Sequence, residues 1–311
     1  MTKKKVYIAG STGMVGRNIT ENLDKSKYEI FTTKRADLDL LDYEKTKKYI
    51  NDIKPDYIIN AAGKVGGISA NNENPYGFFT ENILIGINLV KSAYETGVQN
   101  FLNLSSSCSY PCNAPIPLKE EYLLSGKLEK TNEGYAIAKS AIAKMCEFIT
   151  TQNKNLNYKT IILCNLYGKY DKYDENNSHL IPAIIKKVHY AKENNLPHIE
   201  IWGDGTPKRE IMFATDLGIM MNDILRDFDK IPTIMNIGTG TEYSVNEYYE
   251  IIAKIIGYQG KFTHDLNKLQ GVNRKLLELS LQNNFGYKPA HTLEEGITET
   301  YNNYLEYEQS R

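Results

Sequence analysis

Short apolar runs alternate with longer segments of helical periodicity along the first half of the chain. Alternating strands and helices are typical of an α/β protein, in which crossover helices cover a parallel sheet on both faces. We therefore predict an α/β fold with a doubly wound parallel sheet. The predicted strands are 5–9, 28–32, 57–60, 101–104 and 159–164, and the predicted helices are 14–23, 79–96 and 135–150.

The pattern loosens after Asn165, where residues 167–178 are polar and aromatic. We expect residues 1–165 to form a nucleotide-binding domain, to which residues 212–240 return. Residues 166–211 and 241–311 then form a smaller, discontinuous C-terminal substrate lobe that closes over the end of the sheet, where ligands bind in open α/β folds. In this half, apolar spacing predicts helices 179–193, 245–256 and 293–307 and strands 199–202 and 234–237.

The composition argues against several classes of partner. The 311 residues carry a formal net charge of −1, so we expect no nucleic acid partner. No stretch approaches the roughly 20 apolar residues of a membrane span, and we expect no secretory leader and no membrane association. The four cysteines form neither a paired framework nor a metal-ligand set, which predicts a cytoplasmic protein without a metal ion.

A glycine-rich turn follows the first predicted strand and opens the first predicted helix. This context is the one that a dinucleotide-binding turn requires. Glycines let the backbone approach a pyrophosphate, and the helix N-terminus supplies N–H donors and positive potential. The alternative is an ordinary tight turn. We predict a Rossmann-type dinucleotide site that includes Gly10, Thr12, Gly13, Met14, Val15 and Gly16.

The end of the second predicted strand indicates which dinucleotide binds. Sites for NAD usually carry an acidic residue there, whereas this chain has Lys34 and Arg35 before its first acid at Asp37. A cationic Arg35 favours a 2′-phosphate and predicts NADP(H). The alternative is that both cations are solvated surface charges. We also predict that Asp39, Leu40, Ala61 and Ala62 lie along the cofactor.

Tyr135 and Lys139 are four residues apart on a predicted helix, so their side chains share one face. A phenol has a pKa near 10, and we expect the neighbouring ammonium to lower the pKa of Tyr135. Ser106 follows the fourth predicted strand and can hydrogen-bond a substrate oxygen. The three residues, of which Tyr135 and Lys139 also bind the cofactor, predict the reduction of a carbonyl. Hydride reaches the carbon while Tyr135 protonates the oxygen.

Cys108 and His179 suggest a second chemistry in the same pocket. A ketone acidifies the C–H bonds on both neighbouring carbons, because it stabilises an enolate. A thiolate on one face of the sugar and an imidazole on the other could remove and return protons and so invert stereocentres. The alternative is a packed small residue at a strand end and a histidine that begins a helix.

The chain resembles the extended short-chain dehydrogenase/reductases, and among them the GDP-L-fucose synthases, over nearly its whole length. Several of the matching segments are specific to that subfamily. The segments are 9–16 (AGSTGMVG), 64–68 (KVGGI), 70–72 (ANN), 106–111 (SSCSYP), 131–139 (TNEGYAIAK), 165–168 (NLYG), 177–182 (NSHLIP), 202–210 (WGDGTPKRE) and 274–277 (RKLL).

The resemblance implies a substrate and roles. In that family, GDP-4-keto-6-deoxy-D-mannose is epimerised at C3 and C5, and NADPH then reduces C4. The resemblance implies Ser106, Tyr135 and Lys139 as the reductase set and Cys108 and His179 as the epimerase acid/base pair. It implies that Asn165, Lys187, Trp202 and Arg209 contact the GDP-linked 4-keto sugar, since cations can neutralise a pyrophosphate and an indole can stack. It also implies a homodimer through helices 79–96 and 135–150.

Departures from the family pattern gather on the nucleotide and sugar side. Lys187 stands where the family usually has arginine, which replaces a planar fork by a point charge. Ser11 and Thr12 replace a commonly basic pair in the cofactor turn. These changes keep C4 reduction intact and leave the sugar open. A first alternative is therefore a C4 reductase of a GDP-4-keto-heptose without epimerase activity.

Two further alternatives change the class of protein. A nucleotide-sugar 4,6-dehydratase would carry an Asp-Glu pair where this chain has Ser107 and Cys108. A non-catalytic NADP-sensing regulator tends to lose the catalytic tyrosine or lysine, whereas Tyr135 and Lys139 are both present. The residues favour a reductase over both alternatives.

Overall fold

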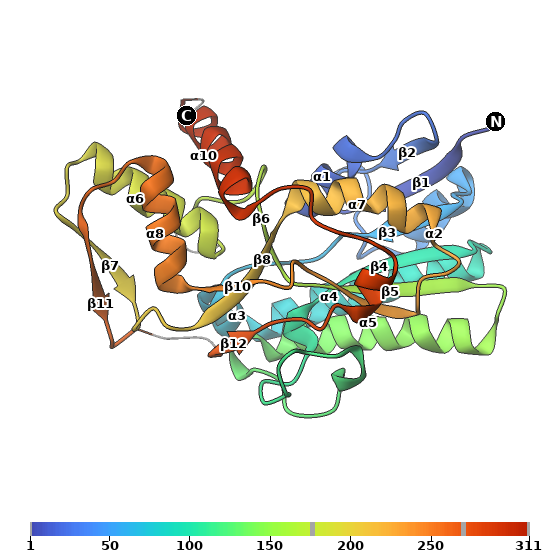
Figure 1. Cartoon of the computed structure of the whole chain (residues 1–311). Helices are drawn as coiled ribbons and strands as arrows, with labels where there is room; N and C mark the ends of the chain where they lie inside the picture. Colours follow the sequence, from blue (N-terminus) through green and yellow to red (C-terminus); the bar gives the residue numbers. More distant parts are fainter. Residues whose placement is uncertain (1, 175–177, 269–271, 310–311) are drawn as a thin grey trace.

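The computed structural model describes residues 2–174, 178–268 and 272–309, which form a large parallel sheet with helices on both sides and smaller sheets beside it (Figure 1). Within these residues the large sheet has six strands in the order β2-β1-β3-β4-β5-β9, and every neighbouring pair is parallel. The predicted doubly wound α/β fold is therefore confirmed. The strands are β1 (Lys4–Ala9), β2 (Tyr28–Thr32), β3 (Tyr57–Asn60), β4 (Asn100–Ser106), β5 (Asn157–Leu163) and β9 (Ile234–Ile237).

Both faces of this sheet are buried at its inner strands, which explains the apolar runs of β1 and β3. Val6 and Ile8 of β1 pack into one core, and Tyr7 and Ala9 pack into another on the opposite face. The first core includes residues of helices α1 (Met14–Asn22) and α7 (Ala214–Arg226), and the second includes residues of α2 (Tyr43–Ile53), α4 (Pro75–Glu95) and α5 (Glu133–Gln152).

Two glycines let α4 and α5 approach closely. A Cβ on Gly86 would lie 2.4 Å from Ile142 Cγ1, and one on Gly134 would lie 2.6 Å from the Pro75 carbonyl oxygen. Side chains at these positions would push the helices apart. Since α5 carries Tyr135 and Lys139, the close packing helps to fix their position over the sheet.

The second half of the chain builds smaller sheets. Strand β8 (Lys208–Phe213) lies between β10 (Glu242–Ser244) and β12 (Arg274–Lys275), and β6 (Asn165–Tyr167) also pairs with it. Strand β7 (His198–Trp202) pairs with β11 (Lys261–Asp265). A separate apolar core packs α6 (Leu180–Glu193), α8 (Val245–Ile256) and α10 (Leu293–Gln309) together. Helices α3 (Ile68–Glu73) and α9 (Ser280–Asn284) are short.

Several elements were not predicted from the sequence, and α2 shows why. Its sequence is mostly polar, and it buries Thr46 and Ile50 alone. It is fixed by its ends instead, since Asp42 accepts a hydrogen bond from the backbone N–H of Lys45 as an N-cap. Polar residues outnumber apolar ones in α2, so a search for apolar runs passes over the helix.

The described residues include no helix long and apolar enough to cross a membrane, and no cluster of three or more His, Cys, Asp or Glu side chains that could hold a metal ion. All four cysteines are described, and each is a free thiol. Asn177, which belongs to one of the segments matched to the family, lies outside the described residues.

Candidate active site

The glycine-rich turn between β1 and α1 is shaped as a cradle for a phosphate group. Gly10 has a φ of +80°, and a Cβ there would lie 2.6 Å from the backbone nitrogen of Ala62. A Cβ on Gly16 would lie 2.3 Å from the Gly10 carbonyl oxygen, which also accepts a hydrogen bond from Gly13 N at 3.1 Å. The backbone can therefore approach a bound pyrophosphate, and the first N–H groups of α1 are free to donate to it. The residues present fit a dinucleotide.

The other residues predicted for the cofactor surround this turn. Ala61 N donates to the Ala9 carbonyl, so the end of β3 lies beside the turn, and Thr12 is exposed at its open side. Met14 is half-buried, and Val15 packs against the core. The structure thus brings the turn and the end of β3 together at one edge of the sheet.

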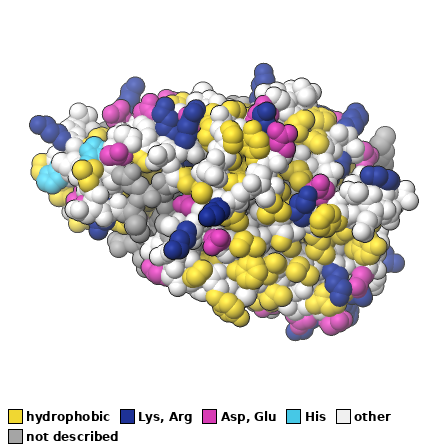
Figure 2. Space-filling model, turned by 90° about the horizontal axis from the view of Figure 1, so that it is seen from below, with side chains coloured by type: hydrophobic (Ala, Val, Ile, Leu, Met, Phe, Trp, Pro, Cys, Tyr) yellow, Lys and Arg dark blue, Asp and Glu magenta, His cyan; other side chains and the backbone are white. Residues whose placement is uncertain are grey.

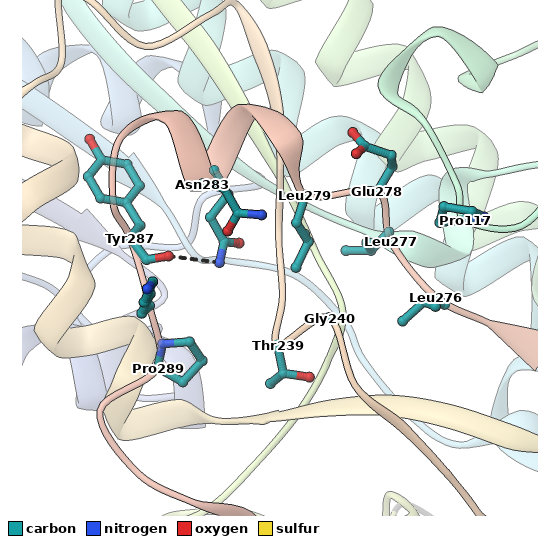
Figure 3. Close-up of a pocket in the computed structure, with 12 residues that line it drawn as sticks. Pro117, Thr239, Gly240, Leu276, Leu277, Glu278, Leu279, Asn283, Tyr287 and Pro289 are labelled. Carbon is teal, nitrogen blue, oxygen red and sulfur yellow. Dashed lines mark hydrogen bonds between the residues drawn. The ribbon is translucent and has the colours of Figure 1, made fainter.

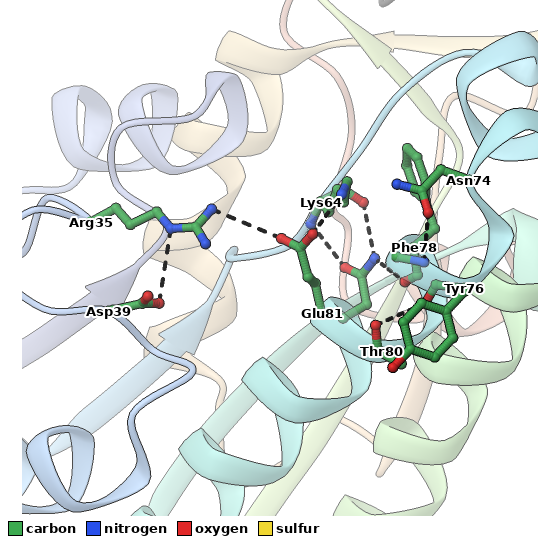
Figure 4. A network of polar contacts seen from close by, with 10 residues as sticks. Arg35, Asp39, Lys64, Asn74, Tyr76, Phe78, Thr80 and Glu81 are labelled. Atoms are coloured by element: carbon green, nitrogen blue, oxygen red, sulfur yellow. Dashed lines mark hydrogen bonds and ion pairs between the residues drawn. The ribbon is translucent and has the colours of Figure 1, made fainter.

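Arg35 belongs to a network of charged side chains after β2 (Figure 4). It lies 3.9 Å from a carboxylate oxygen of Asp39 and 3.9 Å from one of Glu81, and its side chain is 71% exposed. Glu81 in turn pairs with Lys64 at 2.5 Å. Ion pairs this long and exposed are weak, so Arg35 remains available to a phosphate. The Leu40 backbone is fixed by a hydrogen bond from Asn88 at 2.9 Å.

The predicted reductase residues meet where β4 ends. Ser106 is the last residue of β4, and it hydrogen-bonds the phenol of Tyr135 on α5. Lys139, one turn further along α5, places its Nζ 5.8 Å from the centroid of the Tyr135 ring. The same Nζ donates to the Leu104 carbonyl at 3.1 Å, which anchors the ammonium to β4.

The pKa of Tyr135 differs from the sequence-based expectation. Burial raises it above its ordinary value of 10, and the nearby Cys108 raises it further, while the hydrogen bond with Ser106 opposes both. Lys139 does not reverse this direction, because its ammonium is buried as well and bonds a carbonyl. Tyr135 is therefore a protonated phenol at neutral pH, which suits a proton donor.

Cys108 lies in a short 3₁₀ turn, Ser107–Ser109, directly after β4. Ser106 caps this turn by accepting a hydrogen bond from Cys108 N at 3.3 Å. The Cys108 sulfur lies 3.4 Å from the Nζ of Lys275, and it is close enough to Tyr135 and Arg209 to influence their pKa values. Cys108 thus lies beside the residues predicted for the reduction.

His179 sits directly before α6, as its N-terminal flanking residue. Its Nδ1 lies 3.3 Å from Asp171 Oδ1, and the Asp171 side chain is 3% exposed while that of His179 is 39% exposed. Among the described residues the hydrogen bonds of His179 and of Cys108 go to different partners, Asp171 and Lys275. A carboxylate beside an imidazole orients the ring and fixes its tautomer. The sequence analysis did not predict Asp171 as this partner.

The four predicted nucleotide-sugar residues come from separate elements of the second half. Asn165 and Arg209 are on the paired strands β6 and β8, and burial lowers the pKa of Arg209. Lys187 donates to the Glu200 carbonyl of β7, and burial lowers its pKa too. Trp202 ends β7 with its side chain 61% exposed, and Lys268 Nζ lies 5.3 Å from its ring centroid. Two partly buried cations and an open indole can receive an anionic nucleotide.

A cavity of about 530 Å³ lies elsewhere, between the loop after β9 and residues 276–289 (Figure 3). Gln282 fixes its wall by bonding Gly238 and the Tyr287 carbonyl. None of the predicted site residues lines it. We therefore assign the cavity no part in the chemistry.

Comparison with known proteins places these residues in context. The model of the NAD dependent epimerase/dehydratase family matches residues 6–238. A GDP-L-colitose synthase from Yersinia pseudotuberculosis is 46% identical over 97% of this chain and 98% of its own length. A GDP-L-fucose synthase from Azorhizobium caulinodans is 44% identical over 97% and 96%. The structure of a GDP-mannoheptose C4 reductase from Campylobacter jejuni with NADP bound is 30% identical and covers 98% of this chain and 99% of its own, with a TM-score of 0.89.

Proposed function

This chain belongs to the NAD dependent epimerase/dehydratase family, and we propose that it is an NADPH-dependent C4 reductase of a GDP-4-keto-6-deoxy sugar that also epimerises C3 and C5, as a GDP-L-fucose synthase does. The observation that carries this proposal is the meeting of Ser106, Tyr135 and Cys108 at the end of β4. The near full-length similarity to named GDP-sugar synthases supports the substrate class.

NADP(H) is the cofactor that the chain's own residues accommodate. The cradle of Gly10, Gly13 and Gly16 fits the pyrophosphate, and the exposed Arg35 can receive a 2′-phosphate. The solved C4 reductase with NADP bound agrees with this assignment. When bound, the cofactor supplies the hydride that adds to C4.

The residues at the end of β4 supply the proton for that reduction. Tyr135 gives its proton to the C4 oxygen, and Ser106 holds that oxygen by a hydrogen bond. The phenolate that forms is stabilised by the Lys139 ammonium, which the Leu104 carbonyl holds in place. The ketone has then gained a hydride and a proton and has become an alcohol.

Epimerisation comes first and uses the two other residues. Cys108 and His179 remove and return protons on the carbons that flank the ketone. Asp171 keeps the His179 ring oriented. Asn165, Lys187, Trp202 and Arg209 hold the GDP, which keeps the sugar ring within reach of the pocket at the end of β4. We assign residues 1–165 and 212–240 to cofactor binding and residues 166–211 and 241–311 to binding of the nucleotide sugar.

The test is turnover of GDP-4-keto-6-deoxy-D-mannose with NADPH in deuterated water, followed by NMR of the product. We expect GDP-L-fucose with deuterium at C3 and C5 of the sugar. Cys108→Ser should abolish the incorporation at the carbon that Cys108 serves, while hydride transfer from GDP-L-fucose to NADP⁺ in the reverse direction continues. Absence of any NADPH oxidation by this substrate would refute the proposal.

A second candidate substrate is a GDP-4-keto-heptose, because the GDP-mannoheptose C4 reductase covers nearly the whole chain. The relative named GDP-L-colitose synthase points to a further GDP-linked L-sugar as product. Reduction of a GDP-4-keto-heptose without deuterium incorporation would favour the heptose as the substrate. Cys108 and His179 would then take no part in catalysis.

The rate of reduction should fall as pH rises through about 8. Burial lowers the pKa of Lys139 to about 8, so its ammonium is present below that pH and is lost above it. Each pH unit above the pKa removes about tenfold of the charged form, and stabilisation of the Tyr135 phenolate goes with it. The measurement is single-turnover oxidation of NADPH across this range. Lys139→Arg, which stays charged, should lose the decline near pH 8. A wild-type rate that stays constant well above pH 8 would contradict this role.

We propose a homodimer through the exposed face of α4 and α5. Figure 2, which views the molecule from the side of these helices, shows hydrophobic side chains gathered on that face. Leu84 and Tyr94 of α4 and Ile137 and Phe148 of α5 are each at least 41% exposed. Exposed apolar groups this concentrated are typical of a protein interface.

Light scattering at micromolar concentration should therefore report a dimer. Phe148→Asp is expected to weaken the dimer at least about tenfold, because it buries a charge in an apolar interface. Tyr190→Asp is the matched control, since Tyr190 is an equally exposed aromatic residue on α6. A monomeric wild-type protein would contradict the assignment.

With free cysteines and a nicotinamide cofactor, we place the protein in the cytoplasm.

A further inference from the structure

Lys275 has no role in the chemistry described above, yet its ammonium contacts the sulfur of Cys108. The Nζ lies 3.4 Å from Cys108 Sγ and 3.5 Å from Glu129 Oε2. The side chains of Lys275 and Glu129 are 16% and 15% exposed, so solvent screens this cluster weakly. A cation at this distance favours a thiolate over a thiol.

The backbone of Lys275 is held from two sides. As part of β12 it pairs in parallel with β8, with Lys275 opposite Arg209. Two residues later, Leu277 N donates to the buried carboxylate of Glu210 at 2.9 Å. The Leu276 carbonyl accepts a hydrogen bond from Leu118 N at 2.8 Å. A segment fixed in this way can present a side chain with little freedom to move.

The side chain of Lys275 is held by Glu129. One carboxylate oxygen of Glu129 accepts from Thr131 Oγ1 at 2.9 Å, and the other faces the Lys275 ammonium. Thr131 and Glu129 lie on the segment that leads into α5, the helix of Tyr135. Glu129 thus ties Lys275 to the same element that carries the proton donor for reduction.

We propose that Lys275 is the positioning residue for Cys108, whose sulfur it holds in the pocket and stabilises as the thiolate. The inference rests on the proposed function, in which Cys108 exchanges a proton with a carbon beside the ketone. When the thiolate takes that proton, an S–H bond forms and the C–H electron pair passes into the enolate. Return of the proton reverses both changes. Lys275 keeps its own protons throughout.

Three other titratable groups bear on Cys108 among the described residues. Cys108 lies close enough to Tyr135 and Arg209 to raise the pKa of each, and Glu129 lies beyond Lys275. Removing the Lys275 charge leaves Glu129 without its cation, so both changes disfavour the thiolate. The competing role for Lys275 is to bind the substrate pyrophosphate as a simple cation. In that role the loss of Lys275 would raise the KM for the sugar nucleotide in deuterium incorporation and in hydride transfer alike.

The first experiment measures Cys108 alkylation by iodoacetamide across pH, without substrate. A Cys112→Ser background removes the exposed thiol, while Cys146 and Cys164 are buried. Lys275→Met should move the midpoint of the alkylation profile up by about one pH unit, as expected for the loss of one neighbouring cation. Lys275→Arg should restore a midpoint near that of the wild type. Lys254→Met, on the exposed side of α8, is the matched control.

The second experiment follows deuterium incorporation and hydride transfer separately in the full-length enzyme. Lys275→Met should slow incorporation at neutral pH about tenfold, in line with the shift in midpoint. Hydride transfer from GDP-L-fucose to saturating NADP⁺ should fall far less. Circular dichroism and NADPH titration check that the variant is folded. Lys275→Gln provides the same test if the methionine variant does not fold.

The outcomes separate this inference from the proposed function. An alkylation profile that is the same in Lys275→Met and wild type overturns the inference and makes Lys275 a substrate-binding or structural residue. A shifted profile in an enzyme that incorporates no deuterium from any GDP-4-keto sugar retains the pair of Lys275 and Cys108 and refutes epimerisation.

Discussion

Tyr135→Phe is expected to slow hydride transfer by roughly 10²–10⁴-fold, the usual contribution of general acid catalysis. The variant loses the proton that the C4 oxygen needs, and Ser106 can hydrogen-bond that oxygen without replacing the proton. Because burial keeps Tyr135 protonated at neutral pH, its removal takes away a donor that is ready before the sugar binds. The measurement is single-turnover oxidation of NADPH with a GDP-4-keto sugar.

Affinity for NADPH should change little in this variant. The cradle at Gly10 and Gly16 follows β1, whereas Tyr135 is on α5, so the cradle keeps its shape when the hydroxyl is removed. Tyr158→Phe is a matched control. Its hydroxyl is also buried, but it donates to the Val98 carbonyl and serves the core. That variant should lose about 1 kcal/mol of stability and keep its rate. A Tyr135→Phe enzyme of near wild-type rate would remove Tyr135 from the mechanism.

Gly16→Ala should lower the free energy of unfolding by about 3 kcal/mol, a cost typical of overpacking. It should also weaken NADPH binding. Alanine ordinarily stabilises a helix relative to glycine, so propensity alone predicts the opposite sign. Here the new Cβ would lie 2.3 Å from the Gly10 carbonyl oxygen and 2.7 Å from Ser11 Cα. Both atoms are backbone, so α1 must move away from the turn that holds the pyrophosphate.

Thermal unfolding and NADPH titration check this expectation together. Gly13→Ala is the control for stability, because its Cβ would lie 3.5 Å from the same carbonyl oxygen, an ordinary contact. We expect that variant to stay within about 1 kcal/mol of wild type. Equal stability of Gly16→Ala and Gly13→Ala would show that the turn yields more easily than its geometry indicates.

The fold could be predicted where the chain repeats a simple pattern. Strands β2, β3 and β9 and helix α8 have the bounds that the apolar spacing gives. Strands β3 and β9 are almost entirely buried and α8 buries one face, so their apolar signal is strong, while β2 is a short run rich in strand-forming residues. Helix α2 and the short strands β10 and β12 bury few side chains and take their place from capping and from pairing with neighbours. Local sequence carries little of that information.

By itself the sequence predicted the chemistry near the cofactor. Glycines at fixed spacing after a strand, and Tyr135 and Lys139 one helical turn apart, specify their geometry locally, because four residues of a helix or a turn fix their own distances. Cys108 and His179 were candidates from their residue types, and the resemblance to GDP-L-fucose synthases implied their roles as an acid/base pair. These predictions needed no knowledge of how distant segments meet.

The tertiary structure decided the electrostatics. Burial raises the pKa of Tyr135 where a neighbouring ammonium suggested that it would fall, since desolvation depends on everything that packs around the ring. The sequence analysis did not predict that Asp171 contacts His179 or that Glu81 contacts Arg35. Lys275 reaches Cys108 across 167 positions of sequence. Contacts at that separation arise because β12 pairs with β8, and long-range pairing is set by the whole fold.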